Sequence, residues 1–378
     1  MTGKERLLTA MRNQQPDRVP VAPDISNMIP CKMTGKPFWD VYLHNSPPLW
    51  KAHLAASRYF GFDIWGHYAT LDITWRNPIP AESKIVSNGD CSRRFVTTYH
   101  TRKGDMTTCY LYPHDQPAWP EEKLIKNIKE DLFVLKDFFA MPDKVAGDEF
   151  YKHYCREVGD QGVIQPIVAI PGVHIWEGFI QGGVETTLYG VFDYPELFEE
   201  MAEYEKGRAK KILEIYLDYH PDSILLGASG LMTLQNVDLF RRFSLPMIQM
   251  ATKMCKEAGV LTNLHACGRS RQLVEILANE TDLDCFNPLE DYRTGGDIEL
   301  KEVKEALGDK IALWGNINTT NVILDHSAAE VKEACRQAIE AAGKGGGFIL
   351  STGDQIGRDT PYENIFAMVE AAKEFGQY

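Results

Sequence analysis

The second half of the chain repeats one pattern, in which a short apolar run is followed by a longer segment of helical periodicity. Such runs occupy residues 163–172 (VIQPIVAIPG), 223–230 (SILLGASG), 259–268 (GVLTNLHACG), 284–290 (DCFNPLE), 311–318 (IALWGNIN) and 346–354 (GGFILSTGD). Strands that alternate with helices are typical of βαβ units, which build parallel sheets. The pattern therefore predicts an α/β fold with a parallel sheet.

Helix boundaries are marked in three places. Thr2 and Glu5 have the spacing of a capping box before a helix that Pro16 and Pro20 prevent from continuing. Ser327 and Glu330 have the same spacing, and the helix that they open is expected to stop at Gly343. A last helix is predicted from residues 360–363 (TPYE) to Gly376.

Two further strands are predicted at residues 19–26 (VPVAPDIS) and near residues 63–69 (DIWGHYA), which brings the total to about eight. Eight parallel strands close into a (β/α)8 barrel. The alternative is an open doubly wound sheet, but no G-x-G-x-x-G sequence follows an early strand. We therefore expect one barrel domain over residues 1–378, with residues 83–113 forming a β-hairpin or small meander laid onto it.

Composition narrows the classes of function. A net charge of -13 without a Lys/Arg block argues against a nucleic-acid partner. The apolar runs are shorter than the roughly 18 residues of a membrane-spanning helix, and the charged N-terminus does not resemble a secretory signal. The eight cysteines form no C-x-x-C pair, so we expect no disulfide framework, no four-cysteine zinc site and a cytoplasmic location.

In a barrel, function is located where the strands end at their carboxyl side. The polar residues at the ends of the predicted strands are Glu177, Ser229, His265, Cys267, Asn287, Glu290, Asn316, Asn318, Ser351 and Asp354. An imidazole, a thiol, carboxamides and carboxylates at one face predict a catalytic mouth. Trp176, Phe179 and Trp314 lie beside strand ends and are candidates for the walls of an apolar pocket, or for core.

His265 and Cys267 stand two residues apart, on the same side of an extended segment. Imidazole nitrogen and thiolate sulfur both bind Zn²⁺, and a catalytic zinc site has three protein ligands and one open position. The alternative at this stage is a satisfied core histidine beside a small buried cysteine.

Three separated segments resemble the uroporphyrinogen decarboxylase-like superfamily in the right order. They are residues 4–20 (KERLLTAMRNQQPDRVP), 263–277 (NLHACGRSRQLVEIL) and 345–376 (GGGFILSTGDQIGRDTPYENIFAMVEAAKEFG). The superfamily contains porphyrinogen decarboxylases and corrinoid-dependent methyltransferases. Its decarboxylases carry an arginine-rich signature after the first strand that binds the carboxylates of the porphyrin. This chain has no arginine between Arg18 and Arg58, which argues against that activity.

The methyltransferase branch is more similar. Resemblance to its methylcobamide:thiol members implies zinc bound by His265, Cys267 and a distant cysteine, but Asp354 occupies the place of that cysteine. A His/Cys/Asp site makes zinc a harder Lewis acid that favours an oxygen ligand over a thiolate. The chain is thus expected to demethylate a methoxylated aromatic compound, passing the methyl group to the corrinoid of a separate protein.

On this hypothesis the metal ligands are His265, Cys267 and Asp354. Glu177 and Glu290 are expected to act as general acids or further ligands, with Asn316 and Asn318 orienting the substrate. The residues expected to bind substrate are Trp176, Phe179, Ser229 and Trp314. The alternatives are a thiol methyltransferase, a metal-free decarboxylase and an inactive scaffold, and the choice between monomer and homodimer stays open.

Overall fold

Extended segments from eight parts of the chain form a ring in the computed structural model, which describes residues 1–378; residues 19–22 are one of them, and β8 and β9 together are another. Two of them, β1 (Ile64–Gly66) and β8 (Gly162–Ile164), pair with each other. A six-stranded sheet contains β9 (Ile167–Ala169), β10 (Ser223–Gly227), β11 (Leu261–His265), β12 (Cys285–Asn287), β13 (Ala312–Ile317) and β14 (Phe348–Thr352).

Backbone hydrogen bonds close this ring. Residues 19–22 lie between the two sheets, because Leu350 N donates to Pro20 O at 2.9 Å and Asp63 N donates to Val21 O at 2.9 Å. On the other side, β8 and β9 are consecutive parts of one extended segment, and Gln165 N donates to Gly66 O at 2.9 Å. The predicted (β/α)8 barrel is confirmed, and each of its strands lies in one of the predicted apolar runs.

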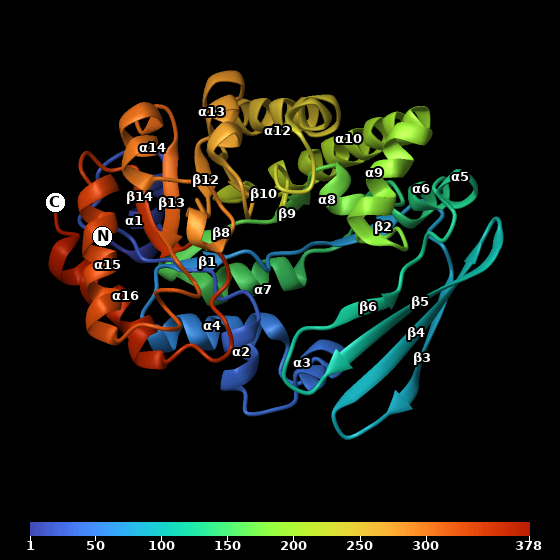
Figure 1. Cartoon of the computed structure of the whole chain (residues 1–378), viewed down its shortest axis with the longest axis horizontal. Helices are drawn as coiled ribbons and strands as arrows, with labels where there is room; N and C mark the ends of the chain where they lie inside the picture. The colour runs from blue at the N-terminus through green and yellow to red at the C-terminus, as the bar shows by residue number, and fades with distance from the viewer.

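Helices surround the barrel (Figure 1), and a core of 64 buried residues fills the space between helices and strands. The outer helices are α4 (Leu49–Phe60), α7 (Glu149–Val158), α10 (Pro195–Leu217), α12 (Leu245–Glu257), α13 (Arg271–Glu280), α14 (Leu300–Leu307), α15 (Ala328–Ala342) and α16 (Tyr362–Phe375). The predicted capping boxes open α1 (Gly3–Met11) and α15. None of the helices combines the length and apolar character that crossing a bilayer requires.

Helix α1 closes the amino-terminal end of the barrel. Its Leu7, Ala10 and Met11 pack in one buried cluster with inward-facing strand residues that include Trp65 and Trp314. Large side chains therefore fill the lower part of the barrel, and the carboxyl ends of the strands remain as the place for a site.

Two antiparallel elements are added to the barrel. A four-stranded sheet projects at one side (Figure 1), in the order β3 (Ala81–Asn88), β4 (Ser92–Thr101), β5 (Gly104–Pro113) and β6 (Trp119–Glu122). A second pair joins β2 (Asp72–Trp75) to β7 (Pro142–Gly147). The connecting helices are α2 (Met28–Met33), α3 (Phe38–His44), α5 (Ile128–Asp131), α6 (Val134–Phe138), α8 (Val173–Trp176), α9 (Gly183–Asp193) and α11 (Val237–Leu239).

Candidate metal centre

Three barrel strands deliver the polar side chains that meet at the mouth. Strand β11 ends at His265, and Cys267 follows in the loop. Strand β14 ends at Thr352, two residues before Asp354. Strand β12 ends at Asn287, in register with His265. Because the strands are parallel, their carboxyl ends bring residues from distant parts of the chain to the same end of the barrel.

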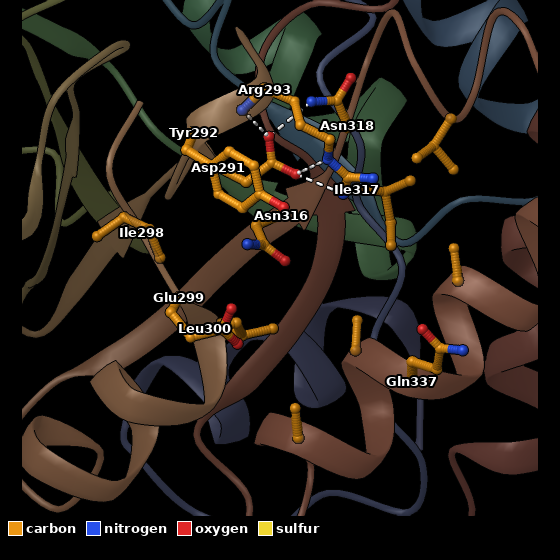
Figure 2. Close-up of a pocket in the computed structure, with 14 residues that line it drawn as sticks. Asp291, Tyr292, Arg293, Ile298, Glu299, Leu300, Asn316, Ile317, Asn318 and Gln337 are labelled. Atoms are coloured by element: carbon orange, nitrogen blue, oxygen red, sulfur yellow. Dashed lines mark hydrogen bonds and ion pairs between the residues drawn. The ribbon is translucent and has the colours of Figure 1, made fainter. Parts of the chain in front are cut away.

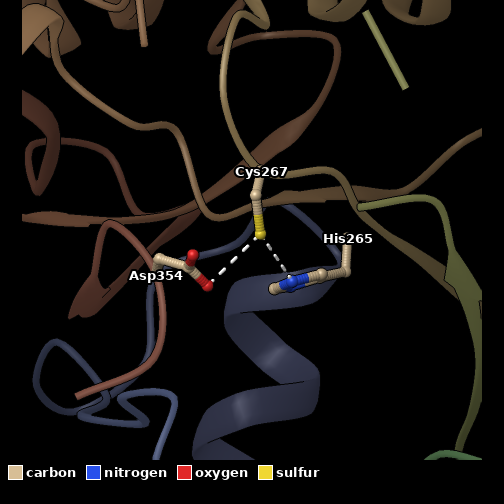
Figure 3. A group of neighbouring side chains, drawn as sticks. All are labelled: His265, Cys267 and Asp354. Atoms are coloured by element: carbon tan, nitrogen blue, oxygen red, sulfur yellow. Dashed lines mark hydrogen bonds between the residues drawn. The ribbon is translucent and has the colours of Figure 1, made fainter. Parts of the chain in front are cut away.

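The imidazole, thiol and carboxylate converge on a common centre, as Figure 3 shows. Cys267 Sγ lies 3.1 Å from His265 Nε2 and 3.2 Å from Asp354 Oδ1. All three donor atoms lie within 4.8 Å of one another, and each side chain is partly exposed. The cluster is therefore open on one side, as a catalytic metal site requires.

The neighbouring Asn287 sets the orientation of the imidazole. Asn287 Nδ2 donates to the Trp314 carbonyl oxygen at 3.1 Å, so the amide oxygen is the atom that faces His265 Nδ1. An acceptor at Nδ1 places the ring proton on that nitrogen. The lone pair of Nε2 then points toward Cys267 and Asp354, which is the tautomer that binds a metal.

A cation would change the electrostatics of the cluster. Burial raises the pKa of the Cys267 thiol, and the negative charge of Asp354 raises it further. A bound cation reverses that effect, because it stabilises the thiolate and neutralises the carboxylate. Nitrogen, sulfur and oxygen donors in this arrangement fit Zn²⁺ with one free coordination position.

Glu290 and Ser229 complete the mouth. Glu290 Oε2 accepts the Gly268 N–H at 3.1 Å, and Ser229 Oγ lies 3.6 Å from Cys267 Sγ. Burial, reinforced by the negative charge of Asp354, raises the pKa of Glu290 to about 7. Glu290 is therefore a group that holds or releases a proton near neutral pH.

Gly268 is required at the position directly after Cys267. Its φ of +83° lies in the left-handed region, and a Cβ there would approach Thr233 Oγ1 to 2.0 Å. The close approach fixes the loop that carries the thiol.

The predictions for four residues near strands β9 and β13 need correction. Trp176 and Trp314 have no exposed surface, so neither lines an open pocket. The Trp176 indole donates to Glu205 and the Trp314 indole donates to the Ala22 carbonyl, which satisfies both in the core. Phe179 packs against other phenylalanines. Glu177 forms an ion pair with Lys123 at 3.1 Å and is not one of the three clustered residues.

Asn316 and Asn318 line a different cavity, which Figure 2 shows between α14, α15 and the end of β13. Its lining contains neither His265, Cys267 nor Asp354. Asn318 Nδ2 donates to Asp291 Oδ1 at 2.7 Å, and Arg293 binds the other oxygen of the same carboxylate. The amide of Asn318 is thus held by Asp291, and the structure does not bring either asparagine to the cluster.

Trp65 and His67 were missed as neighbours of the site. The ring centroids of Trp65 and His265 lie 5.9 Å apart, and those of Trp65 and His67 lie 5.3 Å apart. Burial lowers the pKa of His67 to about 4, which keeps its imidazole neutral. The sequence did contain a signal for these two residues. Residues 63–69 were predicted as a barrel strand, and the residues at the end of such a strand lie at the mouth.

Comparison with known proteins places the chain in a family. The model of the uroporphyrinogen decarboxylase (URO-D) family matches residues 173–375, more than half of the chain. The chain belongs to the URO-D family. The matched range contains His265, Cys267 and Asp354, so the cluster lies within the part that defines this membership.

Known relatives of this URO-D family member include methyltransferases and decarboxylases. A solved methyltransferase from Methanosarcina mazei covers 99% of both chains with a TM-score of 0.65 at 19% identity, which shows the shared fold. A methylcobamide:CoM methyltransferase of Methanosarcina barkeri is 32% identical over 143 residues, 38% of each chain. A uroporphyrinogen decarboxylase of Coxiella burnetii is 24% identical over 194 residues, 49% of each chain. The chain thus spans less than half the length of the curated relatives it matches.

Proposed function

We propose that the protein is a zinc-assisted methyltransferase that moves a methyl group between a methoxylated aromatic compound and the cobalt of a separate corrinoid protein. The observation that carries the proposal is the His265–Cys267–Asp354 cluster, whose donor atoms lie within 4.8 Å of one another. The similarity to a methylcobamide:CoM methyltransferase supports the corrinoid partner. We place the reaction in the reducing cytoplasm, because all eight cysteines are free.

The ligand set favours an oxygen-bearing substrate. When bound, Zn²⁺ supplies Lewis acidity that stabilises negative charge on a substrate oxygen. Asp354 offers a hard carboxylate where a third thiolate would make the site softer. Asn287 keeps the imidazole of His265 in the metal-binding tautomer.

Glu290 is the proton donor in this proposal. Its carboxyl group lies beside the cluster, where it accepts the Gly268 N–H at 3.1 Å, and it is within the mouth where the product would take up a proton. Loss of a methyl group from an aryl ether leaves a phenolate oxygen, which takes up this proton as the product forms. The bond between the methyl carbon and the ether oxygen would break as a bond between that carbon and the partner's cobalt forms, and a reduced Co(I) corrinoid would supply the electron pair.

A thiol acceptor is the second candidate, because the relative from Methanosarcina barkeri is a methylcobamide:CoM methyltransferase. The two candidates differ in the substrate atom beside Asp354, which is oxygen in the first and sulfur in the second. Assays with a methoxybenzene and with a small thiol, each combined with a reduced or methylated corrinoid protein, separate them by the cobalt absorbance. Turnover with the thiol alone contradicts O-demethylation.

Metal content tests the centre itself. We expect about one zinc per chain after dialysis, as for a site with three protein ligands. The variants His265→Ala, Cys267→Ser and Asp354→Ala are expected to lose it. Cys91→Ser is the matched control, since Cys91 is an exposed free thiol outside the cluster. A parent that stays free of zinc after supplementation contradicts the proposal and favours a metal-free lyase or an inactive scaffold.

A further inference from the structure

Backbone hydrogen bonds close the ring at the level of Gln165, but beyond that level the barrel wall is open beside β9. Strand β1 ends at Gly66, which pairs with Ile164 at the end of β8. The segment that contains β8 continues into β9, and β1 has no residues that reach this level. Strand β9 pairs only with β10, so its other edge has no strand partner. A cavity of about 340 Å³ lies along this free edge, between β9, β2 and α10. Ligand pockets start at about 300 Å³, so the cavity has the size for a small molecule.

The lining of this cavity is apolar and partly exposed. Eleven of its fourteen lining residues are hydrophobic. Ile167 is 48% exposed and Trp75 is 36% exposed, although both are large apolar side chains. Exposed apolar surface in a concave site is typical of a ligand-binding pocket.

Arg208 brings a positive charge into this apolar surface. Its guanidinium lies 5.0 Å from the ring centroid of Trp75 and 5.6 Å from that of Phe139, so the two rings hold it in place. Its hydrogen bond runs from Nε to the Ala140 carbonyl oxygen at 3.2 Å. The N–H groups of its two terminal nitrogens therefore remain able to donate to an anion.

Arg208 forms no direct ion pair, although the nearby Glu205 interacts with its charge. The contrast is Arg6, a buried arginine, which forms ion pairs with Asp17 at 2.7 Å and with Asp63 at 2.6 Å. Arg208 forms no ion pair, and its acidic neighbour in the cavity is Glu205. Burial raises the pKa of Glu205 to about 8, so this carboxyl group is mostly protonated at neutral pH. An unpaired charge in an apolar cavity is costly, and an anionic ligand removes that cost.

We propose that this cavity binds a small aromatic carboxylate, with the ring against the apolar wall and the carboxylate paired to the terminal nitrogens of Arg208. Guanidinium and carboxylate match as a bidentate pair, and this geometry is specific for a planar anion. The volume and the apolar wall suit a single ring rather than a polyanion such as a nucleotide.

The cavity shares no lining residue with the metal cluster but lies on its level. Ala169 lines the cavity and is in register with Gly227, which is in register with His265. Two strand spacings of about 4.8 Å put the backbone of Ala169 roughly 10 Å from that of His265. The proposal goes beyond methyl transfer, because binding in this cavity requires neither zinc nor corrinoid.

Calorimetric titration of the full chain with benzoate, and with benzamide as the uncharged isostere, tests the proposal. We expect saturable binding of benzoate and at least about tenfold weaker binding of benzamide, as loss of a charged hydrogen-bonding partner predicts. The variant Arg208→Gln should bind benzoate more weakly than the parent by a similar factor. Arg242→Gln is the matched control, because Arg242 pairs with Glu199 on the surface.

Two further variants keep the outcomes distinct. Ala169→Phe should block the cavity without removing a charge, since the Ala169 side chain is exposed at its rim. Cys267→Ser should leave benzoate binding unchanged. This variant therefore distinguishes a failure of the anion site from a failure of the proposed metal centre. Equal binding of benzoate and benzamide, unchanged binding in folded Arg208→Gln or Ala169→Phe, or no saturable binding by the parent would overturn it.

Discussion

Replacing Glu205 with glutamine should change how stability depends on pH. Glu205 is 9% exposed on α10, and its Oε1 accepts the Trp176 Nε1–H at 3.0 Å. Burial raises its pKa from an ordinary 4.5 to about 8, against smaller opposing effects of Trp176 and Arg208. Glutamine keeps the shape and the acceptor oxygen but has no proton to release.

The sign follows from where the proton is bound. Between pH 4.5 and about 8 the native state keeps the Glu205 proton and the unfolded state releases it. Stability therefore falls as pH rises through this window, by up to about 1.4 kcal/mol per pH unit. Across the whole window the loss amounts to about 4 to 5 kcal/mol.

Urea unfolding at several values between about pH 5 and about pH 8 measures this effect. Over that range the free energy of unfolding should fall less in the Glu205→Gln variant than in the parent, and the difference should reach at most about 4 to 5 kcal/mol. Glu203→Gln is the control, because Glu203 lies on the same helix with a side chain that is 72% exposed. Parallel slopes for the parent and Glu205→Gln would refute the assignment of a buried, protonated carboxyl group.

Three other substitutions test the site and the core. Asn287→Ala should weaken zinc binding by roughly 10- to 100-fold in a chelator competition, because the imidazole loses its orienting partner, and unchanged affinity would contradict the tautomer argument. Gly268→Ala should lower stability by about 1 to 3 kcal/mol in urea, more than Gly35→Ala, which shares a positive φ but has open space around its Cβ. Trp314→Ala should lower the free energy of unfolding by about 3 to 5 kcal/mol. Trp119→Ala should lower it far less, because the Trp119 side chain is 43% exposed. Similar losses for the two variants would argue against a packed barrel interior.

The barrel strands could be predicted because each one is a short apolar run with a turn signal beside it. Residues 311–318 show this, since β13 fills Ala312–Ile317 almost to the predicted bounds. The cluster was predictable for a related reason. His265 and Cys267 are neighbours in sequence, and Asp354 directly follows the last strand, so strand ends and the family resemblance together indicated all three.

The environment of single side chains was not predictable in the same way. Trp176 and Trp314 look the same in sequence whether they face a pocket or a core, because apolar residues serve both. Asn318 was expected at the mouth, but its direction depends on Asp291, which enters from a neighbouring loop. The cavity beside β9 depends on where β1 stops, and no local pattern indicates the length of a three-residue strand.

In the proposed function, the construction of the cluster would let one barrel serve either an oxygen-bearing methyl donor or a thiol acceptor. His265 and Cys267 come from β11 and its loop, and Gly268 and Asn287 fix their positions. Asp354 comes from the separate loop after β14 and is held by the Gln355 N–H at 2.7 Å. With zinc bound as proposed, exchange of this one loop residue would change the hardness of the metal site, while the barrel strands and the other two ligands would stay in place. In the proposed function, selectivity between an oxygen and a sulfur substrate would therefore depend on the loop after β14 rather than on the barrel strands.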